Sequence, residues 1–323
     1  RQGVSMTHTA KVAAAHIAPV FMDKTASAEK AAHWVTKAGA EGVQLLVFPE
    51  VFLPGFPYWI NCYAPLIQAD VNTRYQRESV TIDGPEIQLM ADACREANVS
   101  IVIGISERRV EGHTCHNSAV FITPEDGVVG VHRKLQPTYA ERYIWGQGDG
   151  STLIAPLTPA GRVSALCCWE HTMNLARQAV IEQQPEIHAA LWPSLSTMAG
   201  FDAVANIQIE AMMRNHALTG GCFVISASSP VTQEMLQFLD DTLGPQELLS
   251  AGGGWSAIIH PFSGDVVPPV SGEDEQLVTA EINLADIQSA KLWLDGTGHY
   301  ARPEILKLVV DRQPKSTVEY VDQ

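Results

Sequence analysis

The stretch SAVFITPEDGVVGVHRK, residues 118–134, decides the fold class of this 323-residue chain. Its two apolar runs, 118–123 and 128–134, contain the β-branched and aromatic residues that favour strands. Glu125-Asp126-Gly127 supplies turn residues between them. Because so short a connection joins antiparallel neighbours, the sheet that contains this hairpin is predicted to be mixed rather than purely parallel.

Short apolar strands alternate with amphipathic helices on both sides of this hairpin. Strands are predicted at 11–18, 44–49, 100–107, 163–168, 187–192, 222–227, 254–261 and 276–282, and helices at 25–39, 86–98, 174–184 and 203–218. A loop rich in Pro, Gly and aromatic residues is expected at 53–63, and a polar surface excursion at 232–250. No repeat or linker divides the chain, so we predict one α/β domain over residues 1–323, with a flexible N-terminus at 1–9 and a C-terminal tail from about 305 to 323.

Composition narrows the class of partner and the compartment. The formal net charge of −15 argues against nucleic acid or an anionic membrane as the main partner. No apolar run reaches the ~18 residues of a membrane-spanning helix, and residues 1–9 lack the pattern of a signal peptide. The six cysteines, at 62, 94, 115, 167, 168 and 222, show no disulfide-framework spacing. We therefore expect reduced thiols in a cytoplasmic protein.

Three chemically distinct side chains stand at predicted strand-to-loop boundaries. Cys168 ends the strand 163–168, Glu50 follows the apolar run 44–49, and Lys134 ends the hairpin. A thiol, a carboxylate and an ammonium are the parts of a cysteine hydrolase. Neighbours on a strand face opposite sides, so only one of Cys167 and Cys168 can be the nucleophile. Cys168, nearer the following helix start, is favoured, although a buried core cysteine is the common alternative.

Each of the other two charges also has an ordinary interpretation. Glu50 precedes a loop full of apolar groups, which should raise its pKa towards that of a general base. The alternative is that Glu50 is a solvated residue at the end of a strand. Lys134, if it faces inward, would lower the pKa of a nearby thiol and stabilise an anion; otherwise it is a solvated cation. Glu141, seven residues on, either holds Lys134 or pairs with Arg142 on the surface.

His171 raises two further alternatives. Three residues after Cys168, it suggests a Cys–His pair, although a histidine satisfied by hydrogen bonds near the pocket is the favoured interpretation. A zinc site built from Cys167, Cys168 and His171 is disfavoured because adjacent cysteines lack the usual two-residue spacing. We expect no metal.

Four sets of motifs, in order along the chain, match a known family. They are Phe48-Pro49-Glu50 with Pro54-Gly55-Phe56-Pro57; Arg133-Lys134-Leu135 through Pro137-Thr138-Tyr139-Ala140-Glu141-Arg142 to Trp145-Gly146-Gln147-Gly148-Asp149-Gly150; Cys168-Trp169-Glu170-His171; and Gly298-His299-Tyr300-Ala301-Arg302-Pro303. Each is weak alone, but their order and spacing from about residue 11 to 305 are specific. The chain resembles the nitrilase superfamily of carbon–nitrogen hydrolases, in particular its true nitrilase branch.

This resemblance implies a fold and a set of roles. The implied fold is a four-layer αββα sandwich of two mixed sheets that assembles as αββα–αββα homodimers, extended in many relatives into spirals. The implied roles are general base for Glu50, anion stabiliser for Lys134, nucleophile for Cys168, a supporting carboxylate for Glu141 and a backbone oxyanion donor for Trp169. Substrate-binding positions by the same resemblance are Phe56, Thr138, Trp145, Trp192, Pro193 and Phe201.

The implied reaction needs no cofactor. A small organic nitrile would be hydrolysed to the carboxylic acid and ammonia through a thioimidate and a thioester on Cys168. The run 187–194 resembles arylacetonitrile-preferring members, whereas 145–150 resembles aliphatic and dinitrile hydrolases, so both substrate classes stay open. An amidase or carbamoylase with the same three residues is the alternative enzyme, and a non-catalytic scaffold is the alternative of a different class.

Overall fold

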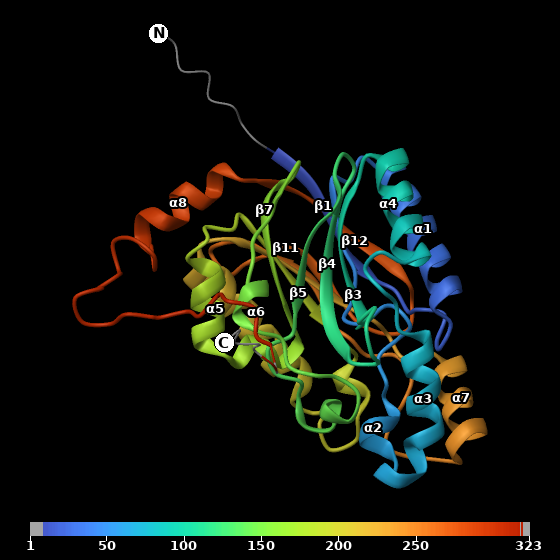
Figure 1. The fold of residues 1–323 in the computed structure, drawn as a ribbon. Helices are drawn as coiled ribbons and strands as arrows, with labels where there is room; N and C mark the ends of the chain where they lie inside the picture. Colours follow the sequence, from blue (N-terminus) through green and yellow to red (C-terminus); the bar gives the residue numbers. More distant parts are fainter. Residues whose placement is uncertain (1–8, 317, 319–323) are drawn as a thin grey trace, which may run out of the picture.

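The computed structural model describes residues 9–316 and 318, and two six-stranded sheets stand at its centre (Figure 1). The first sheet has the order β12-β1-β2-β3-β4-β5. Its strands are β1 (Thr9–His16), β2 (Leu45–Val47), β3 (Ser100–Arg108), β4 (Cys115–Thr123), β5 (Gly127–Arg133) and β12 (Gln276–Asn283). Strands β1, β2 and β3 run parallel, while β12, β4 and β5 pair antiparallel with their neighbours. The hairpin of residues 118–134 therefore makes this sheet mixed, as predicted.

The second sheet repeats the plan with the order β11-β10-β9-β8-β7-β6. Its strands are β6 (Leu157–Thr158), β7 (Gly161–Cys167), β8 (Ile187–Trp192), β9 (Phe223–Ser228), β10 (Ser256–Ile259) and β11 (Asp265–Val270). The central strands β7, β8 and β9 are parallel, and β6, β10 and β11 are antiparallel additions at the edges. Strand β11 was not predicted, because only three of its residues are half-buried and the rest are exposed.

Alternation along the strands separates an inner core from two outer ones. On β1, Val12 and Ala14 face the second sheet, whereas Ala13 and Ala15 face the helices. Helices α1 (Lys24–Ala40) and α4 (Pro85–Ala97) cover the outer face of the first sheet. Helices α5 (Asn174–Ile181) and α6 (Ala205–Gly220) cover that of the second. The layers are helix, sheet, sheet, helix, which confirms the predicted αββα sandwich.

The prediction of a polar surface excursion at 232–250 was wrong in part. Helix α7 (Gln233–Leu243) begins there, because the Thr232 hydroxyl accepts the Met235 N–H and Met235 and Leu239, four residues apart, are both buried. Three more helices were not predicted, namely α2 (Trp59–Cys62), α3 (Ala69–Glu78) and α8 (Ala285–Trp293). None of the helices in the described part of the chain is long and apolar enough to cross a membrane.

Of the predicted N-terminal segment 1–9, residues 1–8 lie outside the described residues and Thr9 already begins β1. The tail from residue 305 runs without helix or strand as far as residue 316, and almost all of it is exposed. It contacts the body where the Lys315 N–H donates to the Asp149 carboxylate over 2.9 Å. The single-domain boundary 1–323 stays a prediction.

Candidate active site

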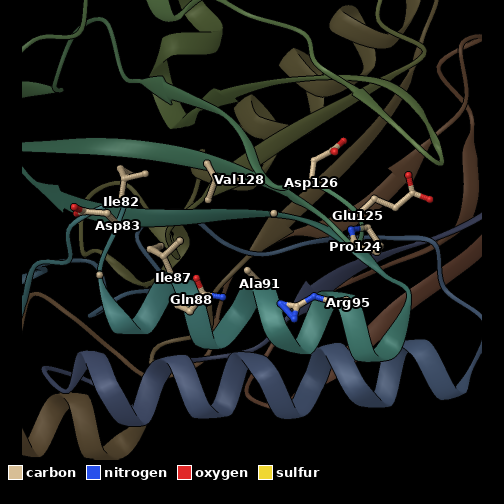
Figure 2. A pocket seen from close by; sticks show the side chains of 12 residues that line it. Ile82, Asp83, Ile87, Gln88, Ala91, Arg95, Pro124, Glu125, Asp126 and Val128 are labelled. Atoms are coloured by element: carbon tan, nitrogen blue, oxygen red, sulfur yellow. The ribbon is translucent and has the colours of Figure 1, made fainter.

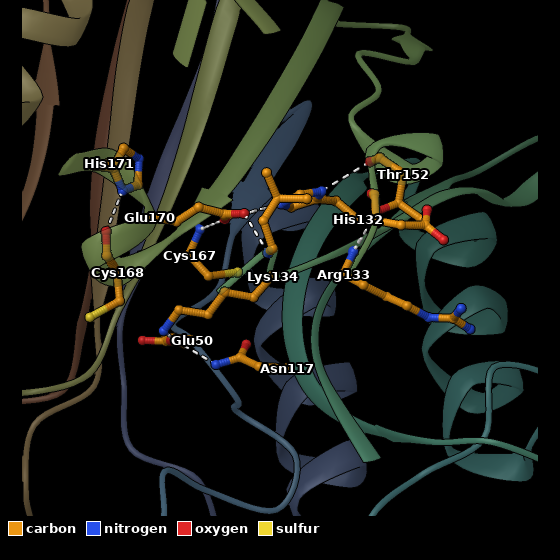
Figure 3. Close-up of polar contacts among 12 residues, drawn as sticks. Glu50, Asn117, His132, Arg133, Lys134, Thr152, Cys167, Cys168, Glu170 and His171 are labelled. Carbon is orange, nitrogen blue, oxygen red and sulfur yellow. Dashed lines mark hydrogen bonds and ion pairs between the residues drawn. The ribbon is translucent and has the colours of Figure 1, made fainter. Parts of the chain in front are cut away.

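Glu50, Lys134 and Cys168 meet at the ends of strands from both sheets (Figure 3). Glu50 follows β2, Lys134 follows β5, and Cys168 follows β7. Each side chain belongs to a residue that is only 1% exposed. One oxygen each of Glu50 and Glu141 and the Cys168 sulfur all lie within 4.8 Å of one another. The three predicted residues thus form one buried cluster.

Lys134 is the cation at the centre of this cluster. Its Nζ donates to Glu50 Oε1 over 2.9 Å and to Glu141 Oε2 over 2.8 Å. Burial alone would lower the pKa of Lys134, but Glu141 and Glu50 outweigh it and hold that pKa well above its usual value. Lys134 therefore stays an ammonium. Of the two predicted alternatives for Glu141, the structure has it holding Lys134.

A short turn aims Glu141 at the ammonium. The turn η2 (Tyr139–Tyr143) starts with a capping box, in which the Thr138 N–H donates to Glu141 Oε2 over 2.8 Å. Thr138, a predicted substrate residue, is half-buried at this cap.

The two carboxylate oxygens of Glu50 differ, because one accepts two hydrogen bonds and the other accepts none from the described residues. Oε1 accepts from Lys134 and from Asn117 Nδ2, the latter over 2.6 Å. Oε2 is buried and has no hydrogen-bond partner among the described residues. Burial raises the pKa of Glu50 to about 7, against the opposing effect of Lys134, as its apolar surroundings predicted. Near neutral pH it can both accept and return a proton.

Cys168 is held in a strained conformation at the start of the turn η4 (Cys168–Thr172). Its φ of +52° lies in the left-handed region that residues with a side chain rarely adopt. Burial and then Glu50 raise the pKa of this thiol well above its usual value, while Lys134 and the Trp169 N–H act to lower it. Lys134 thus acts in the predicted direction, but desolvation is the larger effect. The resting thiol is protonated, and a base must take its proton.

The neighbouring cysteine lies on the other side of the strand. Cys167 packs in the inner core between the sheets, whereas Cys168 packs with Trp192 on the outer face. His171 does not pair with either thiol: its Nδ1 donates to the Cys168 carbonyl over 2.7 Å. This agrees with the favoured interpretation of His171 as a histidine satisfied by hydrogen bonds.

The cluster also has the donor set of a cation site. The Glu50, Glu141 and Cys168 ligand atoms are close enough to share a metal ion. The Lys134 ammonium, however, already bonds both carboxylates, so a second cation would meet direct charge repulsion there. These residues fit their own ammonium better than a metal.

A buried ion pair joins the Cys168 turn to the Lys134 loop, and sequence reasoning missed it. The Glu170 carboxylate accepts from His132 Nε2 over 3.0 Å, from the Leu135 N–H over 2.8 Å and from the Cys167 N–H over 2.9 Å (Figure 3). His132 precedes Lys134 by two residues, and Glu170 follows Cys168 by two. We name the Glu170–His132 pair the brace, because it ties the two sheets together beside the cluster.

Asn117 and Tyr58 are two further residues that sequence reasoning did not assign to the site. Asn117 on β4 lies opposite Lys134 in the hairpin, where its carbonyl accepts the Lys134 N–H over 2.8 Å. Counting back from the turn would have given His116 instead, because a bulge between Phe121 and Ile122 shifts the register by one residue. The Tyr58 phenol, whose pKa burial raises, lies near both Glu50 and Cys168, and it accepts the Ser194 N–H over 2.8 Å.

The predicted substrate residues fall into two groups. Trp192 and Phe201 pack with Cys168 and contact the Trp169 ring. Phe56 and Trp145 pack with Tyr58, and their own rings lie 6.0 Å apart.

Pro193 is buried and its carbonyl accepts the Ser228 hydroxyl; its predicted role in substrate binding stays a prediction. One aromatic group thus packs against Cys168, and the other packs around Tyr58, which lies near Glu50 and Cys168.

The described hollows lie outside this sealed cluster. A cavity of ≈ 340 Å³ lies between α4 and the β4–β5 turn, and Asp83, Arg95 and Glu125 are among the residues that line it (Figure 2). It lies at the opposite end of β5 from Lys134. A wider depression of ≈ 590 Å³ is lined by Gln136, Pro137, Arg142, Trp145, Gly146 and Gln147. It shares Trp145 with the aromatic residues that pack around Tyr58.

Comparisons with known proteins agree with this geometry. The family model described as carbon-nitrogen hydrolase matches residues 11–292. An aliphatic nitrilase of Rhodococcus rhodochrous is 36% identical over 309 residues, which are 94% of this chain and 83% of that protein. A nitrilase of Alcaligenes faecalis described as arylacetone-specific is 35% identical, over 95% of this chain and 87% of that one.

A solved structure has the same fold. Nit3 of Saccharomyces cerevisiae, described as a member of branch 10 of the nitrilase superfamily, aligns with a TM-score of 0.70 at 17% identity, over 91% of this chain and 97% of that chain. The matched family model covers most of the chain and the relatives exceed 30% identity along nearly all of it, so this protein belongs to the carbon–nitrogen hydrolase family.

Proposed function

We propose that this chain is a nitrilase, which hydrolyses a small organic nitrile to the carboxylic acid and ammonia. The observation that carries the proposal is the buried cluster of one thiol, one ammonium and one carboxylate whose pKa is about 7. Support also comes from the nitrilases that are about 35% identical to this chain. As a member of its family, the chain is a hydrolase of carbon–nitrogen bonds.

The first step joins the substrate to the enzyme. Glu50 takes the proton of the Cys168 thiol, and the sulfur attacks the nitrile carbon. The negative charge that develops on the nitrile nitrogen faces the Lys134 ammonium and the Trp169 N–H, and Glu50 then returns the thiol proton to that nitrogen. The product is a covalent thioimidate, with one C–S bond formed and one C–N bond order lost.

Two waters complete the reaction. Glu50 takes a proton from the first water, which adds to the thioimidate carbon and gives a tetrahedral intermediate. This intermediate expels ammonia and leaves a thioester. A second water, again deprotonated by Glu50, releases the carboxylic acid and returns the thiol. The sum is one nitrile and two waters to one acid and one ammonia, and Glu141 keeps Lys134 in place throughout.

The test is ammonia release with chromatography of the products. A panel of phenylacetonitrile, benzonitrile, fumaronitrile, a longer aliphatic dinitrile and the matching amides covers both classes that the relatives' names contain. Acid and ammonia from nitriles, with little from amides, would support the proposal, and the ranking would identify the substrate class. Turnover of amides alone would replace it by an amidase with the same three residues.

A further inference from the structure

A chain of hydrogen bonds runs from the second sheet to the backbone of the proposed nucleophile. Ser164 Oγ lies 2.8 Å from His188 Nδ1, His188 Nε2 lies 2.9 Å from His171 Nε2, and His171 Nδ1 lies 2.7 Å from the Cys168 carbonyl oxygen. Ser164 and His188 are register partners on β7 and β8. All four residues are buried.

The chemistry of the last acceptor fixes the direction of every bond in this chain. A carbonyl oxygen only accepts, so His171 carries its proton on Nδ1. In a neutral His171, Nε2 then accepts, so His188 must donate from its own Nε2. His188 Nδ1 in turn accepts the Ser164 hydroxyl. Every donor therefore points towards Cys168.

Both histidines are neutral, as this pattern requires. Burial lowers the pKa of His171 to about 4 and that of His188 well below its usual value. The His171 ring is also held by stacking on Trp192, with centroids 5.2 Å apart and an interplanar angle of 19°. His171 is thus fixed in tautomer and in orientation.

The peptide that receives the final hydrogen bond is the one that ends in the Trp169 N–H. A peptide unit is planar and trans, so fixing the direction of its carbonyl also fixes the direction of its N–H. Such a constraint is needed at Cys168, because its positive φ is an unfavourable conformation that persists only when the surrounding structure holds it. Hydrogen bonds in series also polarise one another, which makes the distal N–H a stronger donor.

We propose that His171, aligned by His188 and Ser164, is a positioning residue that aims the Trp169 N–H at the anion formed when Cys168 attacks its substrate. The inference rests on the proposed function. His171 acts through the peptide and touches neither the sulfur nor the substrate. Its partners Ser164 and His188 lie on β7 and β8, so the second sheet fixes the position of the His171 ring.

The test compares two substitutions of nearly equal shape, His171→Asn and His171→Leu. Both remove the ring and its stacking on Trp192, but only the asparagine amide can donate from the former Nδ1 position. We expect His171→Leu to lose about tenfold or more in kcat, short of the ~10²- to 10³-fold cost of removing an oxyanion donor outright. KM should change little, and His171→Asn should recover most of kcat.

Two further measurements distinguish a changed orientation of the Trp169 N–H from a defect in folding. The inhibition constant of the aldehyde that matches the best nitrile, which forms a tetrahedral adduct on Cys168, should rise with the loss of kcat in His171→Leu. If His171→Leu does not fold, His171→Gln, which keeps the acceptor at Nε2 and withdraws the donor at Nδ1, should show the same loss. The control is His216→Leu, because the His216 ring packs against His188 with centroids 3.8 Å apart but has no hydrogen-bond partner among the described residues.

The outcomes are distinguishable. Equal losses in His171→Leu and His171→Asn, or a loss in His216→Leu as large as that in His171→Leu, would overturn the positioning role and leave the nitrilase proposal intact. A wild-type protein inactive on every nitrile and amide would overturn both. A selective loss in His171→Leu that His171→Asn restores would support the inference.

Discussion

At the residue scale, reactivity depends on which of two adjacent thiols faces Glu50 and Lys134. Cys168→Ala is expected to abolish ammonia release from nitriles, because no other side chain in the cluster can form the covalent intermediate. Cys167→Ala should keep most of the activity, since its sulfur lies in the inner core between the sheets. Activity assays with circular dichroism and iodoacetamide labelling check both variants. Loss of activity in a folded Cys167→Ala protein would reassign the nucleophile.

The pKa of Glu50, raised to about 7 by burial, sets the expected pH dependence. Only the carboxylate form can take a proton, so kcat/KM should fall as pH drops through about 7 and level off above it. The hydrogen bond from Asn117 lowers this pKa, so Asn117→Ala should move the acidic limb to higher pH. A pH profile on the best nitrile checks both. An unmoved limb in Asn117→Ala would assign the limb to another group.

The positions of Glu50, Lys134 and Cys168 could be predicted because each ends an apolar strand, a signal that is local in sequence. Two features of the site could not. The high pKa of Cys168 depends on complete burial beneath distant aromatic residues, which no local pattern measures. The contacts of Glu170 with His132 and Leu135 cross from one sheet to the other, over 35 residues or more of chain.

At the element scale, the brace joins η4 to the end of β5 and should make stability depend on pH. Glu170 has a lowered pKa, so its contribution is present above about pH 4.3 and is lost as pH falls through its folded value. His132 has a raised pKa, so its contribution is complete below about pH 6.5 and is lost as pH rises through its folded value. The brace is therefore strongest between these limits.

His132→Gln tests this window, because glutamine can keep a neutral hydrogen bond while it removes the charge. We expect a loss of about 1.5–3 kcal/mol in the free energy of unfolding near pH 5.5, the value of a hydrogen bond between charged groups. The loss should shrink towards pH 8. Urea titrations at the two pH values measure it, with the exposed His33→Gln as the matched control. A deficit that is the same at both pH values would mean that His132 is not charged in the brace.

Elements with long apolar repeats were predictable, and short amphipathic ones were not. Helix α1 buries six residues along one face, a signal that its sequence shows clearly. Helices α3 and α7 each bury only two residues, Val71 with Tyr75 and Met235 with Leu239. A single apolar pair four residues apart does not distinguish a helix from a polar loop. Both helices are stabilised by packing their buried pair into the apolar cluster that contains Trp59.

At the scale of the whole molecule, each of the two helices over the second sheet carries a large exposed apolar side chain. Leu175 on α5 and Ile207 on α6 are 69% and 67% exposed. The two helices are neighbours (Figure 1), and Arg177 joins them by a hydrogen bond to Asn215. Large exposed apolar side chains on adjacent helices are typical of a surface that a partner covers. We expect a second copy of the chain to pack here, consistent with the αββα–αββα assembly that the family resemblance implies.

Light scattering after size exclusion at micromolar concentration tests this assembly. The wild-type protein should elute as a dimer or a larger homo-oligomer, because burying these side chains at a two-fold interface removes apolar surface from water on both copies. The double substitution Leu175→Glu with Ile207→Glu would place four like charges at that interface, so it should shift the protein to the monomer. The matched control is Leu66→Glu, on the distant turn η1 (Pro65–Gln68), where the leucine is 93% exposed and a charge should leave the oligomer unchanged. A monomeric wild-type protein, or an oligomer that persists in the double variant, would show that copies do not associate through α5 and α6.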